Sequence, residues 1–173
     1  ADNTFEGIVA VKDASGKDVT NNYKITPKNG TLTITQRPVI VRSLGAEKVY
    51  DDAALEKKEL SIEAFDTQNG RGIVSGHTVA ATFTSSLTDV GTIDNEITDV
   101  IVKDASGKDV TQNYEIECEY GTLKVTPRPI TVTSKDATKV YDATPLSNKE
   151  IDHTPFGENI GLINGHIIEA YTW

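Results

Sequence analysis

The chain has 173 residues, of which 17 are basic and 26 acidic, so its formal net charge is -9. The basic residues are scattered, whereas a phosphate-binding face needs clustered Lys and Arg, so we expect neither nucleic acid nor an anionic membrane surface as a partner. No apolar run approaches the roughly 18 residues of a membrane span, so we expect no membrane insertion. Cys118 is the only cysteine, which leaves no disulfide and no thiolate metal site within one chain.

A tandem repeat organises the chain. Residues 11–20 (VKDASGKDVT) recur letter for letter at residues 102–111, a period of 91. Between residues 11 and 52, 26 of 42 positions are identical to their counterparts. Further along, the offset falls to 89, so we expect a loop between residues 56 and 72 to be two residues longer in the first copy.

The first predicted element is a turn at residues 13–18, between two valines. Gly16 supplies the positive φ that a hairpin tip needs. A calcium loop is the alternative interpretation, because carboxylates and hydroxyls are oxygen ligands, but a third carboxylate and a bidentate Glu at the expected spacing are missing. The calcium candidates in the two copies are Asp13, Ser15, Asp18, Asp104, Ser106 and Asp109.

A terminal hairpin is predicted next, from residues 23–25 and 31–35, where apolar and polar residues alternate. The side chains expected to face a core are Tyr23, Ile25, Leu32 and Ile34. Residues 24–29 (KITPKN) become EIECEY at residues 115–120, so a basic segment turns acidic and gains an aromatic ring. This swap is drift if the repeat is a spacer, but it changes affinity if the hairpin contacts a partner. The candidate partner-binding residues are Lys24, Lys28, Asn29, Glu115, Glu119 and Tyr120.

Segments rich in β-branched residues predict the remaining strands. They are residues 38–41, 60–62, 78–84, 97–102, 114–116 and 122–126. Residues 53–60 contain good helix formers but align with residues 144–151, where a proline and a serine interrupt, so we expect at most one helical turn. Arg37-Pro38 predicts a stiff join between units, because proline is excluded from a central ladder position.

These elements predict an all-β chain of tandem immunoglobulin-like sandwich repeats with packed antiparallel sheets, with β-grasp-like repeats as the alternative. One phase places the second half of a repeat at residues 1–36, a complete repeat at 37–127 and a first half at 128–173. Both halves would then expose sheet edges, which head-to-tail contacts between molecules would cover. The alternative phase places two units at residues 1–83 and 92–173.

Several strings carry a family resemblance. They are residues 30–38 (GTLTITQRP), 48–51 (KVYD), 74–77 (VSGH), 88–92 (TDVGT) and 109–114 (DVTQNY). They resemble the tandem extracellular β-repeats of Gram-positive bacterial cell-surface adhesins, which often carry a Tyr-Asp-Gly signature. The resemblance implies an elongated stalk anchored to the cell wall through regions outside this sequence. Some related surface proteins of gut bacteria bind mucins or immunoglobulins. Asp52 and Ala143 replace the signature glycine, which puts the expected turn in doubt.

No phosphate loop, nucleophile elbow or metal-ligand spacing is found, so we expect no enzyme and no cofactor. His77 and His166 occupy the same repeat position, one unit apart, and are predicted to lie in turns; His153 has no partner for a dyad. A Lys to Asn cross-link is a further hypothesis, set against solvated lysines and turn-capping asparagines. Its candidates are Lys48, Lys139, Asn22 and Asn113.

Two functional hypotheses follow. The first is a non-enzymatic stalk and adhesive surface, with neighbouring repeats of the same protein as partners. The second is a dedicated binding module for a host glycoprotein such as mucin or for an immunoglobulin, in which repetition raises avidity. In either, we expect Tyr50 and Tyr141 to be core anchors, because each follows a valine and is kept in both copies.

Overall fold

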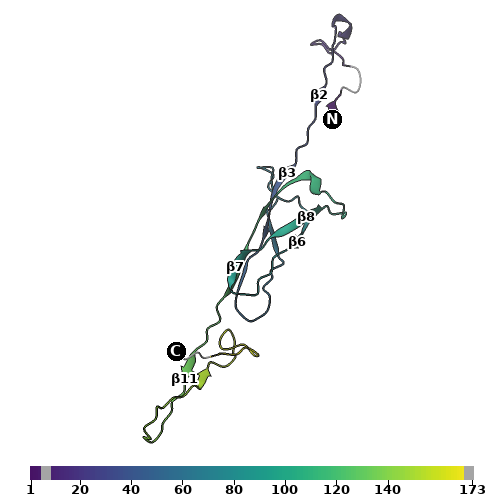
Figure 1. Cartoon of the computed structure of the whole chain (residues 1–173). Coiled ribbons are helices and arrows are strands. Elements are labelled where there is room, and N and C mark those ends of the chain that lie inside the picture. The colour runs from purple at the N-terminus through teal and green to yellow at the C-terminus, as the bar shows by residue number, and fades with distance from the viewer. Residues whose placement is uncertain (5–8, 170–173) are drawn as a thin grey trace. The chain divides into compact units, whose positions relative to one another are not determined.

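The computed structural model describes residues 1–4 and 9–169 (Figure 1). The chain forms two separate units, Ala1–Gln36 and Arg37–Trp173. The first unit contains β1 (Asp2–Asn3), the short 3-10 turn η1 (Thr20–Asn22) and β2 (Gly30–Thr31), with β1 antiparallel to β2. The elements of the second unit are β3 (Arg37–Ser43), β4 (Ala46–Val49), β5 (Leu60–Ile62), β6 (Thr78–Phe83), β7 (Gly91–Asp94), β8 (Ile97–Lys103), η2 (Thr111–Asn113), β9 (Tyr114–Glu119), β10 (Thr122–Thr126), β11 (Val132–Ser134) and β12 (Ile151–His153).

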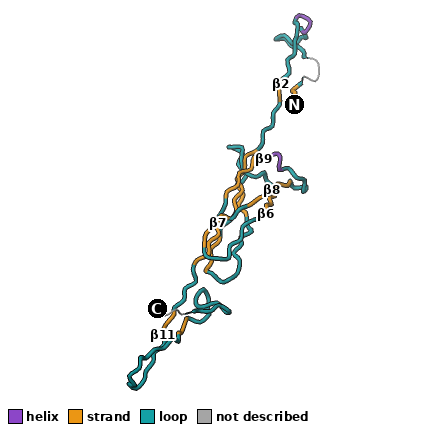
Figure 2. Tube along the Cα trace, in the orientation of Figure 1, coloured by secondary structure: helices purple, strands orange, loops and turns teal. Residues whose placement is uncertain are grey.

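The described residues are strands, turns and loops with hardly any helix (Figure 2). Their only helical segments are η1 and η2, each three residues long, and residues 53–60 contain no helical residue. The all-β prediction is therefore confirmed. Each of the six segments predicted from β-branched residues overlaps a strand of the second unit. Within the part of the chain that the structure describes, no helix is long and apolar enough to cross a membrane.

Residues 37–126 form three sheets, with strand orders β5-β3-β9, β4-β10-β7 and β6-β8. Strand β3 is antiparallel to β5 but parallel to β9, and β4 is parallel to β10. Paired residues of β3 and β9 are 77 positions apart in sequence, as in the pair Arg42 and Glu119. The first strands of this region therefore lie beside its last strands.

Two predictions about strand pairing are wrong. The expected sheets were antiparallel, yet two pairs are parallel. The hairpin predicted at residues 23–35 has its repeat counterpart at residues 114–126, and no hairpin forms there, because β9 pairs with β3 while β10 pairs with β4 and β7. The link at Gly121 continues the strand direction instead of reversing it. It runs against the link at Gly45, and an added Cβ at Gly121 would lie 2.4 Å from the Gly45 nitrogen, so both positions require glycine.

The core lies where the β5-β3-β9 sheet packs on the β6-β8 sheet. Val39 of β3 and Tyr114 of β9 join Val102 and Val110 in one buried cluster. Successive side chains of a strand point to opposite faces, so β3 buries alternate residues and leaves the others partly exposed. Pro38 fits β3 because β5 pairs only with residues 41–43, which leaves no strand on that side of the proline.

The hairpin predicted at residues 23–35 is also wrong. Tyr23 is 58% exposed where its counterpart Tyr114 is 5% exposed, and Leu32 is 57% exposed where Leu123 is fully buried. Ile25 and Ile34 are exposed as well. The reason is that the described part of the first unit contains no counterpart of β3 or β4 to cover these side chains.

Residues 128–169 repeat the first strands of the central region without its last strands. Strand β11 pairs with β12 as β3 pairs with β5, but the described residues contain no counterpart of β9 or β10 beyond them. The counterparts of the buried Val39 and Val41, and of the half-buried Val49 and Tyr50, are consequently exposed, namely Ile130, Val132, Val140 and Tyr141. Tyr141 is 89% exposed, so its prediction as a core anchor is wrong, while Tyr50 is half-buried.

Candidate functional site

The loop at residues 104–109 closes on itself through Asp104. Its Oδ1 accepts hydrogen bonds from Ser106 N at 2.9 Å, Ser106 Oγ at 2.6 Å and Lys108 N at 3.0 Å. The loop at residues 13–18 makes the same three bonds at the same distances. The glycine of each loop has φ near the left-handed value, 84° and 83°, which confirms the predicted turn.

The remaining calcium candidates have similar partners. Asp109 Oδ1 accepts from Thr111 N at 2.9 Å and from Thr111 Oγ1 at 2.7 Å, and Asp18 bonds to Thr20 in the same way. Hydrogen bonds from these hydroxyls, followed by those from backbone amides, lower the pKa of the aspartates in both loops. Among residues 1–4 and 9–169, no group of three or more His, Cys, Asp or Glu is placed to hold a metal ion.

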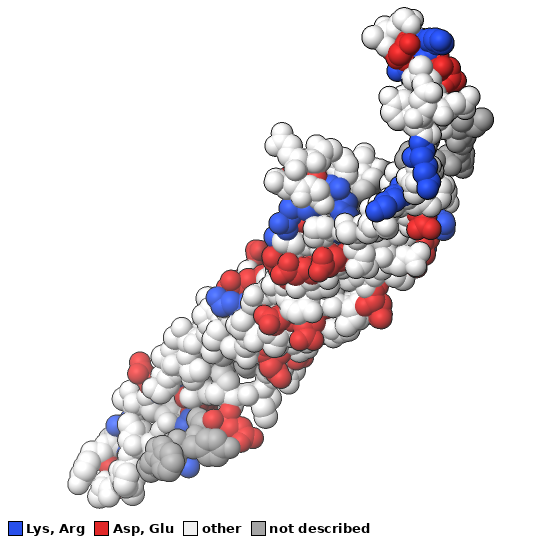
Figure 3. All heavy atoms as spheres, turned by 90° about the horizontal axis from the view of Figure 1, so that it is seen from above, with Lys and Arg blue, Asp and Glu red and all other residues white. Residues whose placement is uncertain are grey.

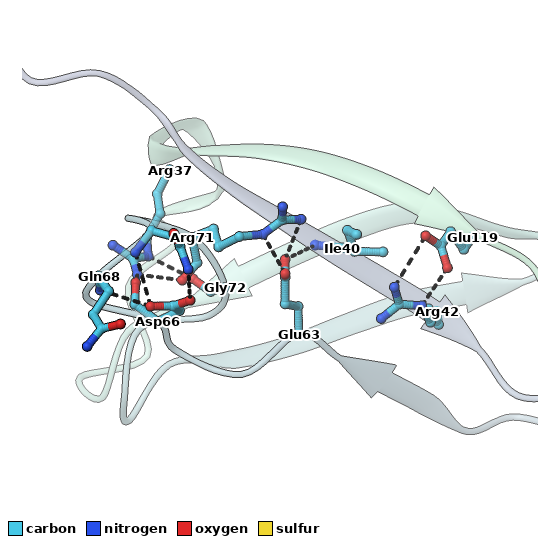
Figure 4. Close-up of polar contacts among 10 residues, drawn as sticks. Arg37, Ile40, Arg42, Glu63, Asp66, Gln68, Arg71, Gly72 and Glu119 are labelled. Carbon is cyan, nitrogen blue, oxygen red and sulfur yellow. Dashed lines mark hydrogen bonds and ion pairs between the residues drawn. The ribbon is translucent and has the colours of Figure 1, made fainter.

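An arginine at the start of β3 binds a loop through three carbonyls (Figure 4). The guanidinium of Arg37 donates to Gly72 O at 2.8 Å, Asp66 O at 2.6 Å and Arg71 O at 2.5 Å. Its Cζ lies 4.4 Å from the ring centroid of Phe65, within cation–π range. The residue that we predicted as a join therefore also fixes the loop at residues 66–71, and we call this arrangement the arginine clamp.

The arginine clamp is repeated one period later. Arg128 donates to the carbonyls of Gly157, Ile160 and Gly161, and its Cζ lies 5.0 Å from the ring centroid of Phe156. The clamped loop is closed by a bridge between residues 66 and 71 in one copy and between 157 and 160 in the other. The clamped loop is therefore two residues longer in the first copy, as the change of repeat offset predicted.

The outer face of the β5-β3-β9 sheet carries charged side chains, which we call the charged face. Its members are Arg42, Glu63, Arg71, Glu115, Glu117 and Glu119. Arg42 Nε lies 2.5 Å from Glu119 Oε2, and Arg71 Nε lies 2.5 Å from Glu63 Oε1. The hydrogen bond from Arg71 lowers the pKa of Glu63, and the one to Glu119 raises the pKa of Arg42. Figure 3 shows clusters of acidic side chains, with basic side chains near them, on the side of the molecule that it draws.

Two shallow hollows lie along the charged face. A hollow of about 470 Å³ is lined by Pro38, Ile40, Arg71, Glu115 and Glu117, among others. A second, of about 250 Å³, is lined by residues that include Arg42, Ser61, Glu119 and Tyr120. None of the described residues forms an ion pair with Glu115 or Glu117. The hollows therefore offer free carboxylates and an exposed aromatic ring to a partner.

The predicted partner-binding residues fall in both units. Glu115, Glu119 and Tyr120 lie together on the edge strand β9 and the link after it, all exposed. Their counterparts Lys24, Lys28 and Asn29 are exposed in the first unit, outside any strand. Sequence reasoning missed four residues of the charged face, because only the pairing of β3 with both β5 and β9 brings these positions together. They are Arg42, Glu63, Arg71 and Glu117.

His77 and His166 each close a turn, as predicted. His77 N donates to Val74 O at 3.0 Å, and His166 N donates to Ile163 O at 3.0 Å. The His77 ring also has a partner that the sequence did not indicate, because its Nδ1 lies 2.7 Å from the hydroxyl of Tyr114. That hydroxyl also accepts from Val74 N at 3.3 Å, so it links the turn to the core.

The backbone turns sharply just after the KVYD segment of each copy. Asp52 and Ala143 have φ of 65° and 63°, so the left-handed conformation of the signature glycine is kept without glycine. Lys48 Nζ lies 2.5 Å from Asp51 Oδ1, and Lys139 Nζ bonds to the corresponding aspartate. The hydrogen bonds of both lysines thus go to this turn, and the candidate asparagines lie in η1 and η2 instead.

Cys118 is partly buried on β9, and burial raises the pKa of its thiol, which disfavours the reactive thiolate. Comparison of the chain with protein-family models, with curated proteins and with solved structures gives no match.

Proposed function

We propose that this chain is a non-enzymatic repeat module of a bacterial cell-surface adhesin, acting outside the cell as stalk and adhesive surface. The observation that carries this proposal is the parallel pairing of the first and last strands. The chain enters at Arg37 beside Tyr114 and leaves at Thr126 beside Val49. Entry and exit thus lie at opposite ends of two consecutive parallel strand pairs.

This geometry suits a tether. A force that pulls on the two ends of residues 37–127 slides β3 and β4 against β9 and β10, so it loads many hydrogen bonds of these pairs at once. An antiparallel hairpin pulled at its open end breaks its bonds one pair at a time. A stalk between a cell wall and a host surface is pulled along its length, so it needs strand pairs whose hydrogen bonds are loaded together.

Single-molecule pulling tests the stalk proposal. In a Cys118→Ser background, handles on Gln36→Cys and Pro127→Cys load the parallel pairs in shear. Handles on Ser75→Cys and Ala105→Cys instead unzip the antiparallel pair of β6 and β8. We expect a clearly higher unfolding force in the first geometry, and an equal or lower force would contradict the proposal.

The phase that we propose has half repeats at residues 1–36 and 128–173 and a complete repeat at 37–127. The pairing of β3 with β9 supports it over units at 1–83 and 92–173, which would separate these strands.

Two features of the central repeat bear on its fold class. The packing of β6 and β8 on the β5-β3-β9 sheet supports an immunoglobulin-like sandwich. The parallel first and last strands favour the β-grasp-like alternative.

The charged face supports a second candidate function, a binding module for a host glycoprotein such as mucin or for an immunoglobulin. The carboxylates of Glu115 and Glu117 line one hollow, and the exposed ring of Tyr120 lines the other. These carboxylates can accept hydrogen bonds from basic groups or from sugar hydroxyls. The resemblance to surface adhesins, through the KVYD and VSGH strings, points to the same partners. Cell-wall anchoring through regions outside this sequence belongs to this proposal as well.

Binding of purified mucin and immunoglobulin to the immobilised chain tests this function. The double variant Glu115→Lys, Glu117→Lys should weaken capture at least tenfold. The double variant Asp89→Lys, Glu96→Lys makes the same charge change at exposed positions away from the charged face and should leave capture unchanged. Equal loss in both variants, or no capture by the parent chain, would contradict this function.

A further inference from the structure

Strand β9 has one edge without a partner strand. The sheet order is β5-β3-β9, and no strand among residues 1–4 and 9–169 pairs with β9 on the side opposite β3. Strand β5, at the other edge of this sheet, has three residues, whereas β9 has six. An exposed edge strand presents a row of backbone N–H and C=O groups to which an extended peptide can be added as a further strand.

The pairing of β3 determines which backbone groups of β9 are free. Ile40 O accepts from Glu63 N on the β5 side, so the even-numbered residues of β3 face β5 and the odd-numbered residues face β9. Val39 lies beside Ile116, and in a parallel pair it bonds to the residues before and after Ile116. The N–H and C=O groups of Ile116, and by alternation those of Cys118, therefore point away from β3.

The side chains on the charged face of β9 select the strand that can be added. Glu119 is paired with Arg42 (Figure 4), but none of the described residues forms an ion pair with Glu115 or Glu117, which we call the free glutamates. They lie two positions apart, roughly 7 Å, which is also the spacing of alternate side chains in an added strand. Opposite charges across neighbouring strands stabilise the pair, and like charges destabilise it. A second copy of β9 paired antiparallel would place glutamate against glutamate, so this edge favours a basic strand.

The hollow of about 470 Å³ beside the free glutamates suits a long basic side chain. Pro38 and Ile40 of β3 line it together with both free glutamates. Lysine and arginine carry apolar methylenes below a charged end, so the stem can lie on the proline and isoleucine while the charge reaches a carboxylate. Arg71 also lines this hollow, but its charge is balanced by the ion pair with Glu63.

The other copy of the repeat carries residues that close such an edge. The counterpart of Cys118 is Pro27, which has no N–H to donate, and two of the three glutamates are replaced by Lys24 and Lys28. Proline and lysine are residues with which proteins protect an exposed edge strand against added strands. Strand β9 contains neither. The free amide at residue 118 and the acidic side chains beside it thus change together between the two copies.

We propose that β9 binds an extended basic segment of a partner protein as an added antiparallel strand. Partner residues opposite Ile116 and Cys118 make the backbone hydrogen bonds, and alternate lysine or arginine residues lie opposite the free glutamates. We choose the antiparallel direction because such pairs are slightly more stable per residue than parallel ones. This inference rests on the second candidate function, binding at the charged face, and names the class of partner segment that this face takes.

Fluorescence anisotropy with labelled synthetic peptides tests the proposal on the full chain at physiological ionic strength. The peptide TKVKTKVKT places its lysines on one face of a strand, and KKKKTVTVT has the same composition without the alternation. The first should bind at least tenfold more tightly than the second. N-methylation of its valines and central threonine removes the amides that face β9 in an antiparallel pair and should weaken binding at least tenfold, whereas N-methylation of its lysines should not. Equal binding by the two methylated peptides, or by the alternating and permuted ones, overturns the proposal.

Variants of the protein separate the backbone from the charge. Cys118→Pro removes the outward amide but no hydrogen bond to β3, keeps every glutamate and should weaken peptide binding at least tenfold. Cys118→Ser keeps the amide and should bind like the parent. Unchanged binding by a Cys118→Pro variant that melts like the parent contradicts the added strand.

The charge contribution is tested with the double variant Glu115→Gln, Glu117→Gln, which should weaken peptide binding at least fivefold. The matched control Asp89→Asn, Glu96→Gln removes two exposed charges away from β9 and should leave binding unchanged. An equal loss in both double variants overturns the assignment of the site to β9. Capture of mucin and immunoglobulin is measured in parallel. Capture without peptide binding overturns this inference alone, whereas peptide binding without capture contradicts only the second candidate function.

Discussion

Residues 11–35 and 102–126 are two copies of the same part of the repeat, and they lie in different structural surroundings. The loop and 3-10 turn at their start have the same hydrogen bonds in both copies. The apolar residues that follow do not behave alike, because Leu123 is fully buried while Leu32 is 57% exposed. The loop is thus determined by its own residues, whereas the strands need β3 and β4 beside them. Paired substitutions in the two copies separate these contributions.

The largest difference is expected for the leucines. Leu123→Ala leaves a cavity in the core of the repeat and should reduce the free energy of unfolding by about 3 kcal/mol. Leu32→Ala removes an exposed side chain and should change it by less than about 0.5 kcal/mol in dilute protein. Denaturant unfolding of the two variants measures both values. Equal losses would show that residues 30–35 are packed in solution.

The tyrosines should differ by a smaller amount. Tyr114→Phe removes the hydroxyl that contacts His77 Nδ1 and Val74 N, and should cost about 1.5 kcal/mol because these groups lose a partner. Tyr23→Phe should have no measurable effect, because Tyr23 is exposed. Thermal melting followed at one protein concentration checks the pair. A tyrosine hydroxyl without a role in the core would give two unchanged melting temperatures.

Substitutions of the loop glycines should have equal effects in the two copies, unlike those of the leucines and tyrosines. An added Cβ at Gly16 or Gly107 meets nothing within 4 Å, but φ of 84° and 83° strains an L-residue. Gly16→Ala and Gly107→Ala should each destabilise their own loop by about 1 kcal/mol. Hydrogen exchange of the loop amides measures this as a roughly fivefold loss of protection in each copy. Loss in only one copy would show that the loops depend on their surroundings.

The smallest expected effect is the loss of loop stability at acid pH. Asp104 and Asp109 accept hydrogen bonds that lower their pKa below the ordinary value of 3.8. Their contribution to stability is therefore fully present above that value and is lost as pH falls through the lower folded pKa. Chemical shifts of the loop amides in both copies should change together in this range. Asp104→Asn and Asp13→Asn should flatten the dependence in their own copy alone.

The sequence predicted much of the local structure. Alternating and β-branched residues located β3, β5, β6, β8, β9 and β10, and the change of repeat offset located the shortened loop at residues 157–160. These features depend on residues that are close in the chain. The turn after each KVYD string was left in doubt without its glycine, yet Asp52 and Ala143 adopt the left-handed conformation.

Strand partners were not predictable in the same way. Parallel and antiparallel strands can bury the same alternating residues, so periodicity could not distinguish a hairpin of β9 and β10 from their separate pairing with β3 and β4. Tyr141 was expected in a core because Tyr50 shares its sequence context, but the context does not supply the strands that cover it. The charged face was only partly predicted for the same reason. The arginine clamp had a signal, since Arg37, Phe65 and Gly72 are all kept in the second copy.

Pairing of residues 77 apart also bears on how the chain folds. Contacts between distant residues slow folding, so β4 and the edge of β3 opposite β5 remain unpaired until the last strands of the same repeat are available. An array of similar repeats risks pairing with the wrong neighbour in that interval. The preceding copy of the last strands, residues 23–35, joins β3 almost directly, and a parallel partner requires a connection of a dozen residues or more. The connection from residues 23–35 to β3 is therefore too short for these residues to pair with β3 and β4 in parallel. The nearest wrong partner is excluded, and β3 and β4 pair with the last strands of their own repeat.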